Sequence, residues 1–227
     1  MQDTEKIWDS FAKEDAKYYI HTGFNKNDDD LKFFESGIKE VEYIISNLET
    51  SKDNRLLELG CGIGRMSVHF SKYFKEVMGV DISSSMISKA KEIHKEISNL
   101  SFLKVSGSGK LENLDNSQFG AVVSWHVLQH IPNYEVIKTY LSEIYRVAKP
   151  GAKIFLHFDT RPNKLLSALL SKMPPFLNPI MPRNYRYGMR RYRRNLKVLI
   201  NDLTEIGFTI LEQQNNNTDR QIIKCTK

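Results

Sequence analysis

The sequence is poor in cysteine, and its two thiols, Cys61 and Cys225, are far apart in the 227-residue chain. Disulfide bonds are therefore not indicated, and a reducing cytoplasm is the expected compartment. No apolar run approaches the roughly 18 residues of a membrane-spanning helix. The first residues also lack the apolar core of a signal peptide. We therefore expect no membrane partner.

What the sequence does contain suits one folded α/β domain. Hydrophobic residues make up 41% of the chain, which is enough for a packed core. The net charge is +6, and residues 183–194 alone hold six arginines. This excess of positive charge favours an anionic partner near that segment, although it says nothing about the fold.

The most informative stretch is an apolar run that ends at a glycine-rich turn. Leu56–Leu59 contains one acidic residue, Glu58, and glycines follow at positions 60, 62 and 64. A second apolar run then ends at Asp81. A strand, a glycine turn, a helix and a second strand with a terminal carboxylate are typical of a nucleoside-binding α/β unit.

The spacing of the glycines indicates which nucleoside is bound. Dinucleotide sites usually have the pattern G-x-G-x-x-G, whereas the third glycine here, Gly64, comes one residue early. Glu58 would also lie unfavourably against a diphosphate, but it suits a ligand with an ammonium or sulfonium group. Asp81 is placed to accept hydrogen bonds from both ribose hydroxyls. We therefore predict S-adenosylmethionine as the cofactor and S-adenosylhomocysteine as its product.

The remaining pattern predicts a doubly wound, mostly parallel seven-stranded sheet with helices on both faces and an antiparallel C-terminal hairpin strand. N-terminal helices and an insertion after the fifth strand are expected to act as a lid. The expected divisions are an N-terminal helical lid (1–50), a cofactor-binding core (51–160), an inserted substrate cover (161–194) and a C-terminal helix with a strand hairpin (195–227).

Five segments, in this order, resemble the class I S-adenosylmethionine-dependent methyltransferases of the small-molecule type. They are Leu57-Glu58-Leu59-Gly60-Cys61-Gly62-Ile63-Gly64, Gly79-Val80-Asp81-Ile82-Ser83-Ser84-Ser85-Met86, Phe119-Gly120-Ala121-Val122-Val123-Ser124, Leu128-Gln129-His130-Ile131-Pro132 and Tyr145-Arg146-Val147-Ala148-Lys149-Pro150-Gly151. Each segment alone is a weak signal, but their joint order and spacing are specific.

The resemblance implies a set of cofactor-binding residues. Backbone groups near Gly60 would hold the methionine moiety, Asp81 the ribose, and Ile82 and Met86 the adenine. The family often has an acidic residue after the third strand, where this chain has Ser108-Gly109. The full implied set is Glu58, Gly60, Cys61, Gly62, Gly64, Asp81, Ile82, Met86, Ser108, Gly109, Ser124 and Trp125.

Methyl transfer needs a base only where the acceptor arrives protonated. The candidates for catalysis are His126, His130 and Tyr18. The candidates for substrate binding are Tyr19, His21, Gln129, His157, Arg183, Tyr185, Tyr187 and Arg190. The competing interpretations are that His157 is a buried partner of a backbone carbonyl and that the arginines of 183–194 are paired with nearby acids. No metal site is expected.

The leading hypothesis is a methyltransferase that acts on an oxygen or nitrogen atom of a small molecule, with an anionic acceptor favoured by the arginines. One alternative is methylation of RNA or protein, docked through residues 183–194. Another is a noncatalytic cofactor-binding protein. A nicotinamide-dependent oxidoreductase is disfavoured by the glycine spacing and Glu58. The sequence leaves the oligomeric state open.

Overall fold

The apolar runs form the strands of one seven-stranded sheet in the computed structural model, which describes residues 2–161, 169, 173–215 and 221–227. The strands are β1 (Arg55–Leu59), β2 (Glu76–Asp81), β3 (Leu100–Lys104), β4 (Phe119–Ser124), β5 (Ala148–Phe158), β6 (Thr209–Asn215) and β7 (Gln221–Thr226). The α-helices are α1 (Gln2–Ile20), α2 (Asp30–Glu35), α3 (Ile38–Leu48), α4 (Ser67–Phe70), α5 (Ser84–Ile93), α6 (Tyr134–Val147) and α8 (Leu196–Ile206). Short 3-10 helices are η1 (Leu128–His130), η2 (Pro175–Ile180), η3 (Arg183–Tyr185) and η4 (Tyr187–Met189).

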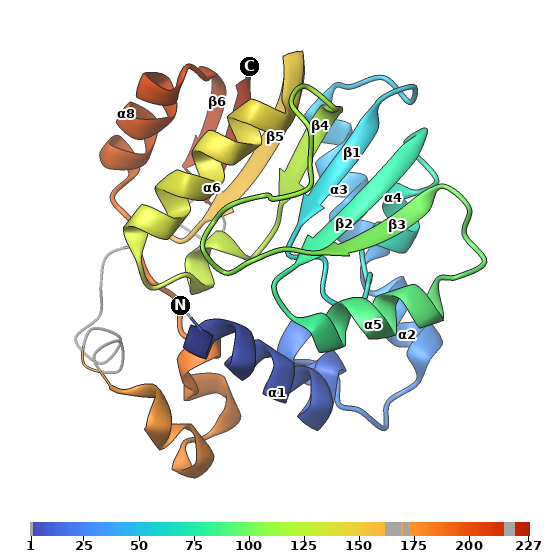
Figure 1. The fold of residues 1–227 in the computed structure, drawn as a ribbon, viewed down its shortest axis with the longest axis vertical. Coiled ribbons are helices and arrows are strands. Elements are labelled where there is room, and N and C mark those ends of the chain that lie inside the picture. Colours follow the sequence, from blue (N-terminus) through green and yellow to red (C-terminus); the bar gives the residue numbers. More distant parts are fainter. Residues whose placement is uncertain (1, 162–168, 170–172, 216–220) are drawn as a thin grey trace.

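The strand order is β3-β2-β1-β4-β5-β7-β6 (Figure 1). Strands β1 to β5 pair in parallel, and β7 lies antiparallel between β5 and β6. This confirms the predicted fold class. Because the chain leaves β1 in one direction to form β2 and later returns to its other edge as β4, the carboxyl ends of β1 and β4 flank a topological switch point. Ligands bind at such points in open α/β sheets.

Helices cover both faces of the sheet, and the side chains of each strand alternate between the two. Leu57 of β1 belongs to a core that includes Ile137 of α6 and Leu199 of α8. Its neighbour Leu56 belongs to a second core that includes Ile44 of α3. This alternation follows from the two-residue period of an extended strand.

Helix α3, which falls within the predicted N-terminal lid (1–50), packs against the sheet through Val41, Ile44 and Leu48. Helix α1 lies instead across the carboxyl ends of the strands, beside α5 (Figure 1). It bends at Asp15, whose backbone is extended and whose carboxylate accepts a hydrogen bond from the Tyr18 N–H at 3.2 Å. This carboxylate caps the final turns and redirects the chain.

The helix expected after the glycine turn is short and does not begin until Ser67, the first residue of α4. Gly62 and Gly64 have φ values of 56° and 83°, which lie in the left-handed region and cannot continue a right-handed helix. Residues 62–66 are therefore turns beside the sheet. Among the described residues, no helix combines the length and apolar character required to cross a bilayer.

Candidate functional site

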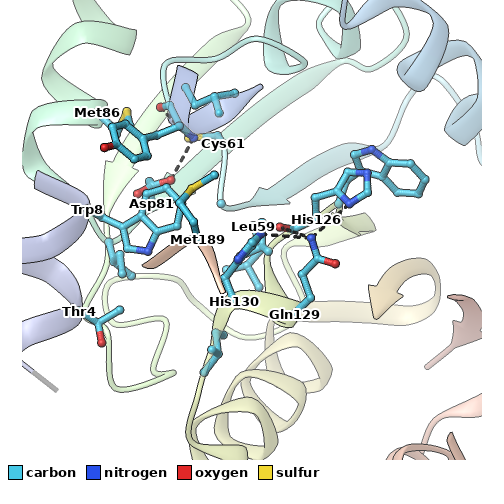
Figure 2. Close-up of a pocket in the computed structure, with 18 of the residues that line it drawn as sticks. Thr4, Trp8, Leu59, Cys61, Asp81, Met86, His126, Gln129, His130 and Met189 are labelled. Atoms are coloured by element: carbon cyan, nitrogen blue, oxygen red, sulfur yellow. Dashed lines mark hydrogen bonds between the residues drawn. The ribbon is translucent and has the colours of Figure 1, made fainter. Parts of the chain in front are cut away.

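A cavity of about 660 Å³ opens at the carboxyl ends of β1, β2 and β4 (Figure 2). Its walls come from the turns that follow these strands, from α1 and from the segment between β5 and α8. The lining residues on which the description below depends are Trp8, Tyr19, Glu58, Gly60, Cys61, Gly62, Asp81, Trp125, His126, Gln129, His130, Tyr187 and Arg191.

The glycine turn brings bare backbone to the cavity wall. Gly60 has a φ of 78°, and a Cβ atom at this position would lie 2.2 Å from Cγ2 of Val127. The N–H groups of Gly60 and Cys61 both donate to the carbonyl of Val80, at 2.7 and 3.1 Å. The turn is therefore held close to β2, and only glycine fits at position 60 without displacing Val127.

Asp81 stands at the tip of β2 with its carboxylate fixed in place. One oxygen accepts the Gly62 N–H at 3.0 Å, and the other accepts the Ser83 N–H at 2.9 Å. Burial raises the pKa of this carboxyl, while the two backbone hydrogen bonds act in the opposite direction. The result is an oriented acceptor in the cavity wall, with remaining lone pairs that could accept hydroxyl groups.

Glu58 lies deeper, where burial raises the pKa of its carboxyl to about 7. The Ser67 hydroxyl donates to it, and the nearby Arg65 guanidinium partly offsets the cost of burial. Arg65 itself is ion-paired with Glu40. Because this cation is already neutralised, the glycine turn offers little to a diphosphate.

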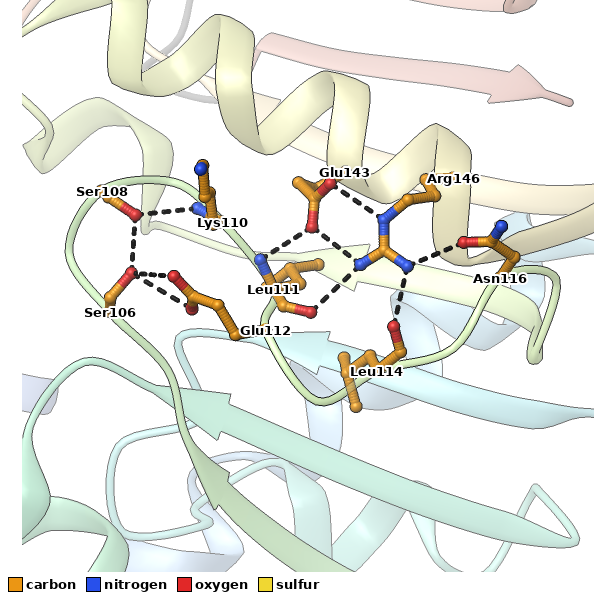
Figure 3. A network of polar contacts seen from close by, with 9 residues as sticks. All are labelled: Ser106, Ser108, Lys110, Leu111, Glu112, Leu114, Asn116, Glu143 and Arg146. Carbon is orange, nitrogen blue, oxygen red and sulfur yellow. Dashed lines mark hydrogen bonds and ion pairs between the residues drawn. The ribbon is translucent and has the colours of Figure 1, made fainter.

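The loop after β3 is fastened to α6 rather than to the cavity (Figure 3). The Arg146 guanidinium donates to the carbonyls of Leu111 and Leu114 at 3.1 and 2.7 Å. The Ser108 hydroxyl is in contact with the Ser106 hydroxyl at 2.6 Å. Ser108 and Gly109 are not among the residues that line the cavity, whereas their neighbour Gly107 lines it.

At the end of β4 the chain adopts a strained conformation. His126 has a φ of 59°, which is costly for a residue with a side chain and is often found at functional sites. Its ring lies 4.3 Å from that of His157, centroid to centroid. His126 and Trp125 line the cavity, whereas Ser124 and the fully buried His157 lie behind them.

His130 is held as a neutral imidazole. Its Nδ1 donates to the Arg190 carbonyl at 2.9 Å, so Nε2 accepts the Gln129 amide N–H at 3.1 Å. Burial lowers the pKa of His130 to about 4. The same amide nitrogen lies 3.4 Å from Nδ1 of His126, so Gln129 joins the two imidazoles in Figure 2.

The arginines of 183–194 largely serve to attach this segment to the rest of the molecule. Arg183 contacts Glu14 at 3.0 Å and Asp15 at 3.1 Å, and Arg186 contacts Glu14 at 2.6 Å. Arg190 is buried and donates to the Tyr185 carbonyl at 3.2 Å. The pairing interpretation holds for Arg183 and Arg186, and within the described part of the chain only Arg191 of the six lines the cavity.

The cavity thus brings together fourteen of the predicted residues. They are Glu58, Gly60, Cys61, Gly62, Asp81, Ile82, Met86, Trp125, His126, His130, Tyr19, His21, Gln129 and Tyr187. The predicted residues outside its lining are Gly64, Ser108, Gly109, Ser124, Tyr18, His157, Arg183, Tyr185 and Arg190.

Sequence reasoning found Tyr19 on α1 but missed the other residues that α1 and α6 contribute. Thr4, Trp8 and Ile20 line the cavity from α1, and Val136 and Tyr140 line it from α6. The four-residue spacing of Thr4 and Trp8 was a usable signal, because such a step brings two side chains to one helical face. Cys61 also lines the cavity, but burial raises the pKa of its thiol well above the ordinary value, which disfavours the reactive thiolate.

Residues 57–156 match the methyltransferase domain family. Demethylmenaquinone methyltransferase of Staphylococcus carnosus is 27% identical over 135 residues, which cover 58% of this chain and 54% of the relative. The chain therefore spans about half the length of that relative.

Solved structures share the fold. Magnesium protoporphyrin IX methyltransferase of Synechocystis PCC 6803, with bound S-adenosylhomocysteine, superposes with a TM-score of 0.66 at 16% identity and covers 99% of each chain. The [4+2]-cyclase SpnF superposes with a TM-score of 0.62 at 16% identity, covering 83% of this chain and 80% of that one. At these identities the likeness concerns the fold alone.

Proposed function

Because residues 57–156 match the methyltransferase domain family, we propose that the chain is an S-adenosylmethionine-dependent methyltransferase that acts on an oxygen or nitrogen atom of a small-molecule acceptor. One observation carries this proposal: a single cavity has Glu58 and Asp81 in one region and His126, Gln129 and His130 in another. A cofactor with a positive charge suits the first region, and a polar acceptor suits the second.

The residues at the glycine turn fit S-adenosylmethionine. Gly60 and Gly62 present bare backbone at the cavity wall, and the Asp81 carboxylate is oriented for a ribose diol. Ionised Glu58 would favour the cationic methionine moiety. When bound, the cofactor supplies an electrophilic methyl group on a sulfonium, which leaves as a neutral sulfide. The protein therefore needs no acid for the leaving group.

The remaining tasks are to align the acceptor, to exclude water and to remove a proton where the acceptor carries one. His126 is the candidate base. His130 is a weak base at neutral pH, because its folded-state pKa is about 4, and we assign it a positioning role through Gln129. We also propose that α1 and residues 173–194 form the lid that excludes water, since Trp8 and Tyr187 reach the cavity from these two parts.

The alternative of RNA or protein methylation rests on the arginines, and two of these, Arg183 and Arg186, are neutralised by Glu14 and Asp15.

The alternative of a noncatalytic cofactor-binding protein is tested directly by an assay for methyl transfer. Purified protein is incubated with cofactor labelled in its methyl group and with phenols, carboxylic acids and amines, and the products are identified by mass. We expect transfer to at least one class.

A variant separates chemistry from cofactor binding. His126→Ala should lower turnover by about 10²–10⁴-fold, the usual contribution of a general base, with little change in the dissociation constant for S-adenosylhomocysteine. Full turnover in this variant would remove His126 from the chemistry. Tight binding of a nicotinamide dinucleotide, with no affinity for S-adenosylmethionine or S-adenosylhomocysteine, would overturn the proposed function itself.

A further inference from the structure

The segment between β5 and α8 presents large apolar side chains to solvent. Phe176 is 76% exposed and Ile180 is 81% exposed, both on η2, which projects beside α1 away from the sheet (Figure 1). Pro174 and Pro179 on the same short stretch are exposed as well. Single exposed apolar residues are ordinary, but a group on a projecting element marks an interaction surface.

Helix α1 adds positive charge beside these residues. Lys6, Ser10 and Lys13 are exposed and recur at helical spacing, so they share one face. Lys6 and Ser10 line a groove together with Pro175 and Phe176. We call this surface, made of Lys6, Ser10, Lys13, Phe176 and Ile180, the outer face of the lid.

Three acidic residues of α1 have partners of their own. Glu5 pairs with Lys104 at 3.0 Å, Asp9 accepts the Ser83 hydroxyl at 2.6 Å, and Glu14 pairs with Arg186. Asp9 also lies close enough to Lys13 for the lysine to lower the pKa of the Asp9 carboxyl. The outer face of the lid therefore combines exposed apolar groups with two exposed lysines, and of these Lys13 has a carboxylate nearby.

We propose that the outer face of the lid docks on an anionic lipid bilayer. Aromatic and aliphatic side chains enter the interfacial region of a membrane, and neighbouring lysines are attracted to anionic headgroups. A second copy of the chain is a poorer occupant, because it would bring the same lysines together. This docking requires no spanning helix and does not depend on the proposed function, but it departs from the expectation of no membrane partner that the sequence alone suggested.

Docking would place the cavity mouth close to the lipid. Asn184 and Arg191 are exposed and also line the cavity, and they follow η2 closely in the chain. A consequence follows that rests on the proposed function: the acceptor is an amphiphile that partitions into the membrane and reaches the cavity from there.

The test is flotation of the purified protein with phosphatidylcholine vesicles that contain or lack phosphatidylglycerol. We expect binding only to the anionic vesicles and a decrease with salt. Lys6→Gln combined with Lys13→Gln should weaken binding about thirtyfold, since each lysine near an anionic surface contributes about a fivefold factor. Phe176→Ser combined with Ile180→Ser should also release the protein.

A matched control is Val198→Ser combined with Leu211→Ser, which removes two apolar residues that are 46% and 51% exposed on α8 and β6. This variant should float as the unaltered protein does. The proposal would be overturned if the control variant lost flotation equally or if the unaltered protein did not float. It would also be overturned if the unaltered protein were a dimer that dissociates when Phe176→Ser and Ile180→Ser are combined. Calorimetry with S-adenosylhomocysteine verifies that every variant is folded and reports separately on the cofactor site.

Discussion

The two ends of the cavity are built by different means. At the cofactor end, glycine backbone and the tips of β1 and β2 form the wall, and Asp81 is fixed by N–H groups from Gly62 and Ser83. At the acceptor end, side chains from α1, η1 and η4 meet, and Gln129 joins two imidazoles. One end depends on backbone geometry, and the other depends on side chains brought together from distant parts of the chain.

This difference explains why the ends should respond differently to substitution. A wall of backbone tolerates no added atom, because neither the strand nor the turn can move far. A wall of side chains can rearrange, and its contacts are partly exposed ion pairs that contribute less. The predictions below test that contrast from the largest effect to the smallest.

The largest effect is expected for Gly60→Ala. The new Cβ atom would lie 2.2 Å from Val127 Cγ2, on a residue whose φ is 78°. Left-handed strain and overpacking together should lower the free energy of unfolding by about 3 kcal/mol, and cofactor binding should be lost. Chemical denaturation and calorimetry with S-adenosylhomocysteine measure the two effects.

Gly151→Ala is the matched control. Gly151 has a similar φ of 75°, but a Cβ atom there would have no neighbour within 4 Å. Only the left-handed conformation should then cost stability, about 1 kcal/mol, and cofactor affinity should be unchanged. If both variants behave alike, close packing at the turn is not what restricts Gly60.

The second prediction concerns Asp81→Ala. Removal of the carboxylate deletes an acceptor for the ribose and also frees the N–H groups of Gly62 and Ser83. Hydrogen bonds to a charged group contribute about 1–3 kcal/mol. The binding of S-adenosylhomocysteine should therefore weaken by about 1–3 kcal/mol, which calorimetry measures as a higher dissociation constant. Unchanged affinity in calorimetry would mean that the ribose is held elsewhere.

The same contrast governs what could be predicted from the sequence. The glycine turn and Asp81 are local features, since strand, turn and terminal carboxylate follow one another in the chain. The doubly wound sheet was predictable for the same reason, because alternating strands and helices leave few topologies. The bounds of α4 could not be predicted in this way, because Gly62 and Gly64 adopt left-handed conformations that delay the start of the helix.

The acceptor end could not be predicted so well, because its residues are far apart in sequence. Trp8 and Met189 meet at the cavity although nothing local links them. Ser108 was expected at the adenine, but hydrogen bonding with Ser106 and the attachment of its loop to α6 by Arg146 leave it outside. Tertiary contacts of this kind leave no periodic signal.

A third prediction compares the opposite pKa shifts of the two ends. The pKa of Glu58 rises from 4.5 to about 7, so its contribution to stability is present below pH 4.5 and lost as the pH rises through 7. The pKa of His130 falls from 6.5 to about 4, so its contribution is present above pH 6.5 and lost as the pH falls through 4. The two dependences oppose each other between pH 4.5 and 6.5.

Variants should separate the opposing dependences in denaturation measured across this pH range. Relative to the unaltered protein, Glu58→Gln should gain about 1–2 kcal/mol more stability as the pH rises from 4.5 to 6.5. His130→Asn should instead lose stability over the same interval. Parallel curves for all three proteins would show that neither group titrates differently in the folded state.

The smallest effect is expected where the lid is held by partly exposed ion pairs. Arg183→Gln combined with Arg186→Gln removes the contacts with Glu14 and Asp15 that join the segment between β5 and α8 to α1. Because Arg183 and Glu14 are each about one-third exposed, their pair should contribute no more than about 1 kcal/mol. The pair of Arg183 with the buried Asp15 adds to this, because its loss leaves a buried carboxylate with one partner fewer. The KM for the acceptor should therefore rise about two- to fivefold, and cofactor affinity should not change. Lys95→Gln, which breaks the exposed pair with Glu92 on the far side of α5, should alter neither constant. A loss of cofactor affinity in the arginine variant would mean that the lid supports both ends of the cavity, and the contrast between them would no longer hold.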